Sequence, residues 1–313
     1  MTRVVALLGT LIAAATAAEV KLIETKGKAL ECRLGDVTLW RLVHDRGEGK
    51  PYFHPVALPD GTVLTWLRPP DHRWHRALWF SWKMINGLNY WEEDRHGKSQ
   101  GITEVTAFRH TRLPYGSVKI DMTLSYHPPG KPEVLSESRT ITITPPDAAG
   151  RYRMDWTMIF TARDREVVLD RTPIPGEPGG KGWGGYAGLS VRTTRGMKNY
   201  HTLNSEGQRD MAGHGKPARW LDFTGIVDGK EVGIALFEHP SNERYPTPMY
   251  IIMRGTFGYL SPAFLFKAPY KLAAGKSLVL FYRLMFHPGR LGKEELEQEW
   301  KAFAALPHPG RGK

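Results

Sequence analysis

The sequence predicts an all-β protein, a large antiparallel sandwich of two sheets with one helix near the C-terminus. Several segments alternate apolar and polar residues with a period of two, the pattern of antiparallel strands that cover a core with one face. Only one window of the chain shows helical spacing. Strands and helices do not alternate along the chain, which argues against a parallel sheet with crossover helices.

The predicted strands lie in the second and last thirds of the chain. Residues 118–126 place an apolar side chain at every second position from Val118 to Tyr126, and residues 152–160 repeat the pattern. The segment 140–144, Thr-Ile-Thr-Ile-Thr, is rich in β-branched residues and ends before two prolines. Asp228-Gly229 between two apolar runs predicts a hairpin over 225–236. Residues 278–286 predict a late, more buried strand.

The predicted helix covers residues 293–304. Leu296, Trp300 and Phe303 follow one another at the spacing of a single helical face. Two stretches without regular structure, 94–101 and the proline- and glycine-rich 173–185, are interpreted as loops over a binding face rather than as domain boundaries. The expected organisation is one sandwich domain over 19–290, followed by a C-terminal helix and basic tail over 291–313.

The first 18 residues are predicted to be a secretory signal peptide. Arg3 precedes an apolar run from Val4 to Ala14, which is too short to span a bilayer, and small alanine- and threonine-rich sites follow it. The expected location is therefore the periplasm or the exterior of a bacterium. The only cysteine, Cys32, excludes an internal disulfide.

Composition excludes several classes of protein. The chain has 313 residues with 10 Trp, 12 Tyr and 12 Phe, enough to bury a large core, so global disorder is excluded. No apolar run after residue 18 reaches the length of a membrane-spanning helix. The net charge is +11, but the basic residues are dispersed and follow no nucleic-acid-binding pattern. This charge either keeps the surface solvated or attracts an anionic partner such as an acidic polysaccharide.

The most informative segment carries five tryptophans between Trp66 and Trp91. A tryptophan ring offers a flat face to the C–H side of a sugar, so Trp74 and Trp79 are candidate substrate-binding residues. The polar cluster 71–76 lies in the same segment and contains His72 and His75, candidate catalytic residues because histidine exchanges protons near neutral pH. Two residues separate these histidines, a spacing that permits metal binding, but no third ligand is evident. The sequence does not identify a cofactor.

Further candidates follow in later segments. Arg192 lies on a predicted strand and is a candidate substrate-binding residue, Glu206 lies in a turn, and His239 and Asn242 follow a strand that proline ends. Glu206 and His239 are candidate catalytic residues, and Asn242 a candidate substrate-binding residue. We expect His72, His75, Arg192, Glu206 and His239 to converge on one concave face, with Trp74 or Trp79 at its wall. The alternative is that the histidines cap separate turns.

Taken together, several motifs resemble a bacterial family of secreted proteins labelled "methane oxygenase PmoA". They are 51–56 (PYFHPV), 60–63 (DGTV), 71–80, 86–91 (NGLNYW), 188–192 (GLSVR), 220–225 (WLDFTG) and 239–242 (HPSN). The resemblance runs from about residue 30 to 290. Where the family has a double histidine, this chain has Trp74-His75. The strand-rich layout also resembles the galactose mutarotase-like supersandwich, a fold that implies carbohydrate binding or catalysis.

Three classes of function remain open at this point. The first is a secreted carbohydrate-active enzyme, whether lyase, epimerase or hydrolase. The second is a non-catalytic glycan-binding protein, which would keep the tryptophans and need no titrating pair. The third is the metal-dependent oxygenase that the family label implies. A multi-spanning methane monooxygenase subunit does not fit a chain without a spanning segment after residue 18, so the carbohydrate classes are favoured.

Overall fold

The computed structural model describes residues 20–308. The predicted signal peptide, residues 1–18, and the end of the basic tail lie outside the described residues. The all-β prediction is confirmed: the sheets are antiparallel, and one α-helix, α1 (Lys293–Ala304), ends the fold. None of the helices within residues 20–308 has the length and apolar character needed to cross a membrane.

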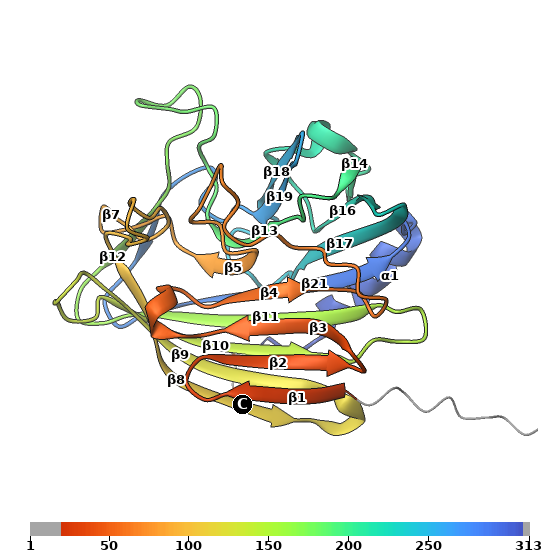
Figure 1. Ribbon diagram of the computed structural model, residues 1–313. Helices are drawn as coiled ribbons and strands as arrows, with labels where there is room; N and C mark the ends of the chain where they lie inside the picture. The colour runs from red at the N-terminus through yellow and green to blue at the C-terminus, as the bar shows by residue number, and fades with distance from the viewer. Residues whose placement is uncertain (1–19, 309–313) are drawn as a thin grey trace, which may run out of the picture.

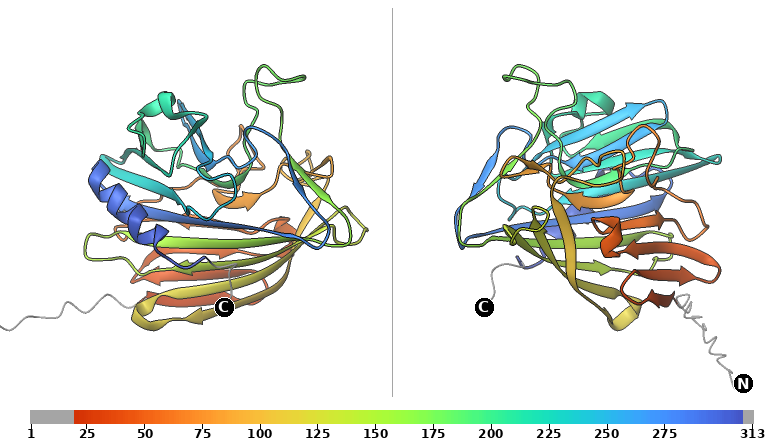
Figure 2. Two further views of the ribbon diagram at one scale, coloured as in Figure 1. Left: turned by 180° about the vertical axis from the view of Figure 1, so that it is seen from behind. Right: turned by 60° about the vertical axis from the view of Figure 1, so that its left-hand side comes forward.

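Three sheets make up the structure, and Figures 1 and 2 show the two large ones lying one over the other. The nine-stranded sheet has the spatial order β1 (Val20–Thr25), β2 (Ala29–Leu34), β3 (Val37–Val43), β4 (Tyr52–Val56), β5 (Leu78–Ser81), β13 (Gly188–Arg192), β19 (Phe257–Pro262), β18 (Pro248–Arg254) and β15 (Lys216–Pro217).

The eight-stranded sheet has the order β14 (Lys198–Asn204), β16 (Trp220–Val227), β17 (Lys230–Glu238), β21 (Ser277–Pro288), β11 (Tyr152–Ala162), β10 (Leu135–Ile143), β9 (Val118–His127) and β8 (Ile102–Arg112). A small sheet joins β20 (Tyr270–Leu272), β12 (Val167–Asp170), β6 (Met84–Ile85) and β7 (Leu88–Asn89). Within residues 20–308, three short 3-10 helices lie at Arg46–Glu48, Pro114–Gly116 and Asp210–Gly213.

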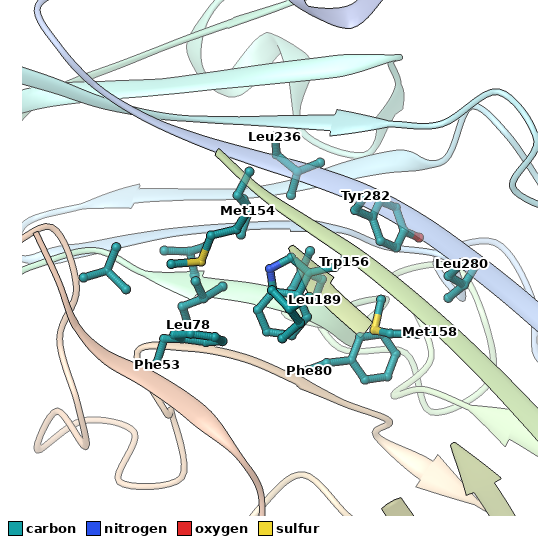
Figure 3. Packing of buried hydrophobic residues seen from close by; sticks show 14 of the residues in the cluster. Phe53, Leu78, Phe80, Met154, Trp156, Met158, Leu189, Leu236, Leu280 and Tyr282 are labelled. Atoms are coloured by element: carbon teal, nitrogen blue, oxygen red, sulfur yellow. The ribbon is translucent and has the colours of Figure 1, made fainter. Parts of the chain in front are cut away.

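The main core lies between the two large sheets. Strand β11 alternates buried and half-buried residues along its whole length, so its apolar side chains point to one face. Figure 3 shows the packing of both sheets in this core. Its members include Phe53, Leu78, Phe80 and Leu189 from the nine-stranded sheet and Met154, Trp156, Met158 and Leu280 from the eight-stranded sheet.

Most predicted elements agree with the structure. Segments 118–126, 152–160 and 278–286 are β9, β11 and β21, and the Asp228-Gly229 turn joins β16 to β17 with Val227 opposite Lys230. Strand β10 begins earlier than the pattern indicated, at Leu135. Its core-facing positions 137 and 139 are charged, and Arg139 bonds both carboxylate oxygens of Glu137 at 2.6 and 2.9 Å. Because this buried ion pair occupies two core-facing positions, the first half of β10 lacks the apolar–polar alternation of a strand.

Helix α1 covers the outer side of the eight-stranded sheet. Leu296 and Phe303 are buried against Trp220, Phe237 and Phe281 of that sheet, as the predicted helical face requires. On its polar side, Glu299 binds Arg153 and Arg283. The helix thus closes the face of the eight-stranded sheet that points away from the main core.

Candidate functional site

The candidate site lies on the face of the nine-stranded sheet that points away from the main core. Alternation along each strand divides its residues between the two faces. On β5, Leu78 and Phe80 join the main core while Trp79 belongs to a second, aromatic cluster on the other side. On β19, Tyr259 also belongs to this second cluster, whereas Leu260 joins the main core.

A short loop before β5 presents both predicted histidines. The backbone N–H of His72 donates to the carbonyl of Pro69 at 3.0 Å, and the N–H of His75 donates to the carbonyl of His72 at 2.9 Å. The N–H of Arg68 donates to the carbonyl of His75, which closes the loop. The two imidazole rings consequently lie side by side, with centroids 4.6 Å apart.

His72 is oriented by a carboxylate. Its Nδ1 lies 3.0 Å from Oδ2 of Asp71, and Nη2 of Arg192 donates to both oxygens of the same carboxylate at 3.1 and 2.9 Å. Burial opposes ionisation of Asp71, but the hydrogen bond from His72 and the charge of Arg192 outweigh it and lower the pKa of Asp71. An ionised carboxylate can only accept, so Nδ1 of His72 donates to Asp71, and in the neutral imidazole Nε2 is then the acceptor.

His75 has a different environment. Its ring contacts both Trp79 and Tyr259, with centroids at 5.1 and 5.6 Å, and only 3% of the residue is exposed. Burial, followed by the nearby His72 and Arg192, lowers the pKa of His75 well below its ordinary value. His75 is therefore a neutral imidazole at physiological pH. Within the described residues, its Nδ1 has no hydrogen-bond partner.

Arg192 is a fully buried cation beneath this pair. Its guanidinium lies 3.5 Å from the ring centroid of Phe257 and 5.2 Å from that of Trp66. Burial lowers the pKa of Arg192, and Asp71 opposes the shift. The described residues give Nε and Nη1 no hydrogen-bond partner. Asp71 is thus the carboxylate that compensates this buried charge.

A pocket of about 240 Å³ opens next to the two histidines. Its walls are almost entirely aromatic, and the lining residues are His72, His75, Trp183, Tyr186, Tyr250, Ile252, Phe257 and Tyr259. Burial raises the pKa of Tyr250 to about 12 and raises those of Tyr186 and Tyr259 further. The three tyrosines therefore keep their hydroxyl protons. Tyr259 uses its hydroxyl in a 2.7 Å hydrogen bond with Ser190 on β13.

A second layer of paired charges supports the site from below. The buried amino group of Lys50 donates to the carbonyls of Trp91 and Tyr90 at 2.7 and 3.3 Å, and burial lowers its pKa to about 8. Lys83 pairs with Glu92, and its amino group lies 5.5 Å from the ring centroid of Tyr186. Lys83 thus contacts a ring that lines the pocket, and Lys50 holds the backbone of Trp91, a member of the aromatic cluster.

The structure brings together five of the eight predicted site residues: His72, Trp74, His75, Trp79 and Arg192. The roles expected for both predicted tryptophans need correction. Trp79 is fully buried beneath His75, so it supports the histidine and does not face a ligand. Trp74 packs against His72 at 5.3 Å and is not among the residues that line the pocket.

The other three predicted residues lie elsewhere, so the expected five-residue convergence does not occur. His239 packs on Phe281 and Phe303 beneath α1, and its Nε2 lies 3.1 Å from the carbonyl of Leu306. Asn242 donates to the carbonyl of Phe281 and closes the turn after β17. Glu206 is exposed and bonds Ser205. His239 and Asn242 both follow β17, a strand of the other large sheet, which separates them from the pocket. They belong to the turn after that strand, as the turn-capping alternative predicts.

Sequence reasoning missed most of the aromatic wall. Tyr250 and Ile252 are alternate residues of β18, and Phe257 and Tyr259 are alternate residues of β19, so period two marks each pair as one face. Trp183 lies in the glycine-rich loop that was interpreted as a cover for a binding face. Within the described residues, no group of three His, Cys, Asp or Glu side chains is placed to hold a metal ion.

Comparison with known proteins gives distant structural similarity and one family. No curated protein matches the chain. A β-arabinopyranosidase structure has 10% identity and a TM-score of 0.45, covering 80% of this chain and 38% of that one. The α-galactosidase from Lactobacillus brevis has 9% identity and a TM-score of 0.41, covering 91% and 41%.

A candidate aldose 1-epimerase from Klebsiella pneumoniae has 10% identity and a TM-score of 0.45, covering 91% of this chain and 87% of that one. The chain spans about two fifths of the length of the first two structures. Residues 29–301 match the model of one protein family across most of the described structure. The chain therefore belongs to DUF6807, a family of unknown function.

Proposed function

We propose that this protein is a carbohydrate-active enzyme in which His72 transfers a proton to or from a sugar bound in the aromatic pocket. The observation that carries the proposal is the Asp71–His72 pair at the edge of that pocket. Asp71 holds His72 in the tautomer that leaves Nε2 free, and the same carboxylate stabilises the imidazolium that forms when Nε2 takes up a proton. This is the arrangement of a general base that later returns its proton as a general acid.

The aromatic walls support a sugar as the substrate. Tyrosine and phenylalanine rings offer apolar faces to the C–H side of a pyranose, while the tyrosine hydroxyls bond its oxygens. His75 adds a neutral hydrogen-bonding group beside His72, since burial keeps it uncharged. A neutral donor next to a base polarises a carbonyl or hydroxyl while the base removes a proton.

The lining of the pocket favours proton transfer at the sugar over glycosidic hydrolysis. Glycosidases generally use two carboxylates on opposite sides of the scissile bond. None of the side chains that line the pocket in the described part of the chain is a carboxylate, and Asp71 is already engaged by His72 and Arg192. Epimerisation and β-elimination, in which an imidazole removes a proton from the sugar, are therefore the favoured reactions.

The test is proton NMR in D₂O of the purified protein with a panel of monosaccharides and disaccharides. Epimerisation by removal of a carbon-bound proton exchanges that proton for deuterium, anomeric epimerisation speeds the equilibration of the α and β anomer signals, elimination gives a vinyl signal, and hydrolysis gives new reducing ends. We expect epimerisation or elimination, and we expect His72→Gln to abolish it. His110→Gln is the matched control, because this histidine lies on β8 and pairs with Glu24. Turnover that persists in His72→Gln would contradict the proposed role.

A glycan-binding protein without catalysis is the second candidate, favoured by the dominance of aromatic side chains in the pocket. Saturable binding of a sugar without any chemical change in the NMR spectra would establish this alternative. A metal-dependent oxygenase, which the resemblance to the family labelled "methane oxygenase PmoA" implies, would need a metal held by His72, His75 and a third ligand. Metal analysis of the purified protein tests it directly.

The proposal extends to location and to the charge of the ligand. We propose export from the cell on the basis of residues 1–18, which cleavage-site analysis of the mature protein would test. If the net charge of +11 attracts an acidic polysaccharide, affinity should fall steeply between roughly 0.05 and 0.5 M salt, because screening shortens to a few ångströms. A flat salt dependence on such a polymer would remove the electrostatic contribution and leave the charge as a solvated surface.

A further inference from the structure

The pocket is small for a ligand that extends beyond one ring. Pockets that enclose drug-sized ligands measure roughly 300–1,000 Å³, whereas this one holds about 240 Å³. A single sugar ring is a suitable occupant, and any ring joined to it must lie at the rim or outside. What the rim presents therefore decides whether the substrate is a monosaccharide or a longer glycan.

The rim presents Trp183. This residue lines the pocket and yet remains 55% exposed, while Trp40, Trp79, Trp82, Trp91, Trp156 and Trp220 are fully buried. Within residues 20–308, the other large hydrophobic side chains with comparable exposure are Tyr115 and Met211. A single exposed apolar side chain is common on proteins, so exposure alone means little. The position at the mouth of the pocket is what distinguishes Trp183.

The loop that carries Trp183 connects β12 to β13 and rises above the sheet in Figure 1. Its base is fixed by an ion pair, in which Nη2 of buried Arg171 bonds both carboxylate oxygens of Glu177 at 2.6 and 2.9 Å. Nε of Arg171 also donates to the carbonyl of Leu265. The carboxylate of Glu177 accepts a further hydrogen bond from the backbone of Ile174.

The two limbs of the loop are also joined backbone to backbone. The N–H of Lys181 donates to the carbonyl of Pro173 at 3.0 Å, and the N–H of Gly185 donates to that of Thr172 at 2.9 Å. A Cβ on Gly184 would lie 2.0 Å from the carbonyl oxygen of Pro173, so the close approach of the limbs requires glycine there. The loop therefore holds Trp183 in a defined place.

One side of the Trp183 ring already has a neighbour. The amino group of Lys181 lies over the ring at 5.9 Å from its centroid, a cation–π contact. Trp183 also lines the pocket, and 55% of the residue is exposed, so Lys181 does not cover the whole ring. An indole held at a pocket mouth with an open face offers a second stacking surface for a sugar ring.

We infer that Trp183 is a second sugar-binding subsite and that the substrate is a glycan of at least two rings, with one in the pocket and the next stacked on Trp183. This inference rests on the proposed carbohydrate function. It adds a substrate class, namely oligosaccharides or glycosides whose second ring can stack on an indole. It also makes Trp183 a residue that determines substrate specificity. The roles proposed for His72 and His75 stay the same.

Calorimetric titration with matched pairs of sugars tests the subsite. The probes are glucose with cellobiose and maltose, galactose with β-1,4-galactobiose, and galacturonic acid with digalacturonic acid. We expect wild-type protein to bind one disaccharide more tightly than its monosaccharide. Trp183→Ala should weaken that disaccharide about tenfold and leave the monosaccharide unchanged. Tyr115→Ala, at an exposed side chain of the 3-10 helix Pro114–Gly116, should change neither.

Fluorescence quenching by acrylamide gives a second readout that does not depend on affinity. Trp183 is exposed, six tryptophans are buried and Trp66, Trp74 and Trp300 are half-buried, so the quenching lost in Trp183→Ala identifies the emission of Trp183. The bound disaccharide should protect that emission from acrylamide while the monosaccharide does not. If Trp183→Ala lost affinity equally for the monosaccharide and the disaccharide, or lost no affinity for the disaccharide, the subsite would be overturned. The pocket proposal would still stand. Wild-type protein that binds none of these sugars would contradict the carbohydrate function itself.

Discussion

The carboxylate of Asp71 lies 3.0 Å from Nδ1 of His72, its neighbour in the sequence, and is held on its other side by Arg192. One carboxylate therefore serves two hydrogen-bond donors of different kinds. It orients an imidazole at the edge of the pocket, and it compensates a guanidinium that is fully buried. The local pair and the long-range pair share one oxygen atom, Oδ2 of Asp71.

Asp71→Asn should reduce turnover and stability together. The amide cannot stabilise the imidazolium, so we expect at least a tenfold loss in kcat with a smaller change in KM. The buried Arg192 also loses its counter-charge, which we expect to lower the free energy of unfolding by about 1–3 kcal/mol. Steady-state kinetics and urea unfolding measure the two effects. Asp164→Asn, at an exposed carboxylate, is the control, and unchanged kcat in Asp71→Asn would argue against the role assigned to His72.

His75 should make the protein less stable in mild acid. Its pKa is lowered in the folded state, so below about pH 6.5 the unfolded chain binds a proton that the folded protein does not. Stability contributed by this group is therefore present above pH 6.5 and is lost as pH falls below it, at up to about 1.4 kcal/mol per pH unit. His75→Phe should reduce the slope of the unfolding free energy between pH 6.5 and 5. Equal slopes in both proteins would show that His75 takes up its proton in the fold.

Glu238 should have the opposite pH dependence. Burial raises its pKa to about 7, although Thr247 and Asn242 donate hydrogen bonds to it. The unfolded side chain ionises near pH 4.5, so this stability is fully present below pH 4.5 and is lost as pH rises through 7. The shift corresponds to roughly 3 kcal/mol.

The variant Glu238→Gln keeps an acceptor for Thr247 and cannot ionise. We expect its unfolding free energy to change less than that of the wild type between pH 5 and pH 8, as measured by urea titration at both values. Glu166→Gln, at an exposed position, controls for the loss of one carboxyl group. If the unfolding free energies of the wild type and of Glu238→Gln changed by the same amount between pH 5 and pH 8, Glu238 would ionise in the fold without penalty.

Gly233→Ala should destabilise the eight-stranded sheet. A Cβ at this position would lie 2.2 Å from Cε1 of His287. That ring has no free direction, because Nε2 contacts Asp222 at 2.9 Å and Nδ1 contacts the carbonyl of Gly289 at 3.1 Å. We expect a loss of about 3 kcal/mol in thermal or urea unfolding. Gly196→Ala, where a Cβ meets open space, should be close to neutral, and similar melting curves for the two variants would contradict the steric argument.

The sequence was informative where one residue pattern decides the structure locally. The alternation in β9 and β11 and the helical spacing in α1 each follow from which face meets a core. The loop that pairs His72 with His75 is also local, because its hydrogen bonds span only a few residues. The single-domain expectation and the signal peptide remain predictions.

Sheet membership was not predictable in the same way. Arg192 and His239 both lie at or just beyond the end of a strand, but β13 belongs to the nine-stranded sheet and β17 to the eight-stranded sheet. The period of a strand reveals which of its residues share a face and does not reveal which partner strand lies beside it. The placement of Tyr259 beside His75, and of Tyr250 in the pocket wall, depends on the same non-local pairing.

The pairing of β5 with β13, and of β13 with β19, has a kinetic consequence. The ion pair between Asp71 and Arg192 joins residues 121 positions apart, and β19 follows later still. Non-local contacts of this kind form slowly, since loop closure must precede the gain in contact energy. In a refolding experiment, recovery of ligand binding should therefore lag behind the secondary-structure signal. A bound sugar would act on the rate of unfolding and leave the early steps of folding unaffected.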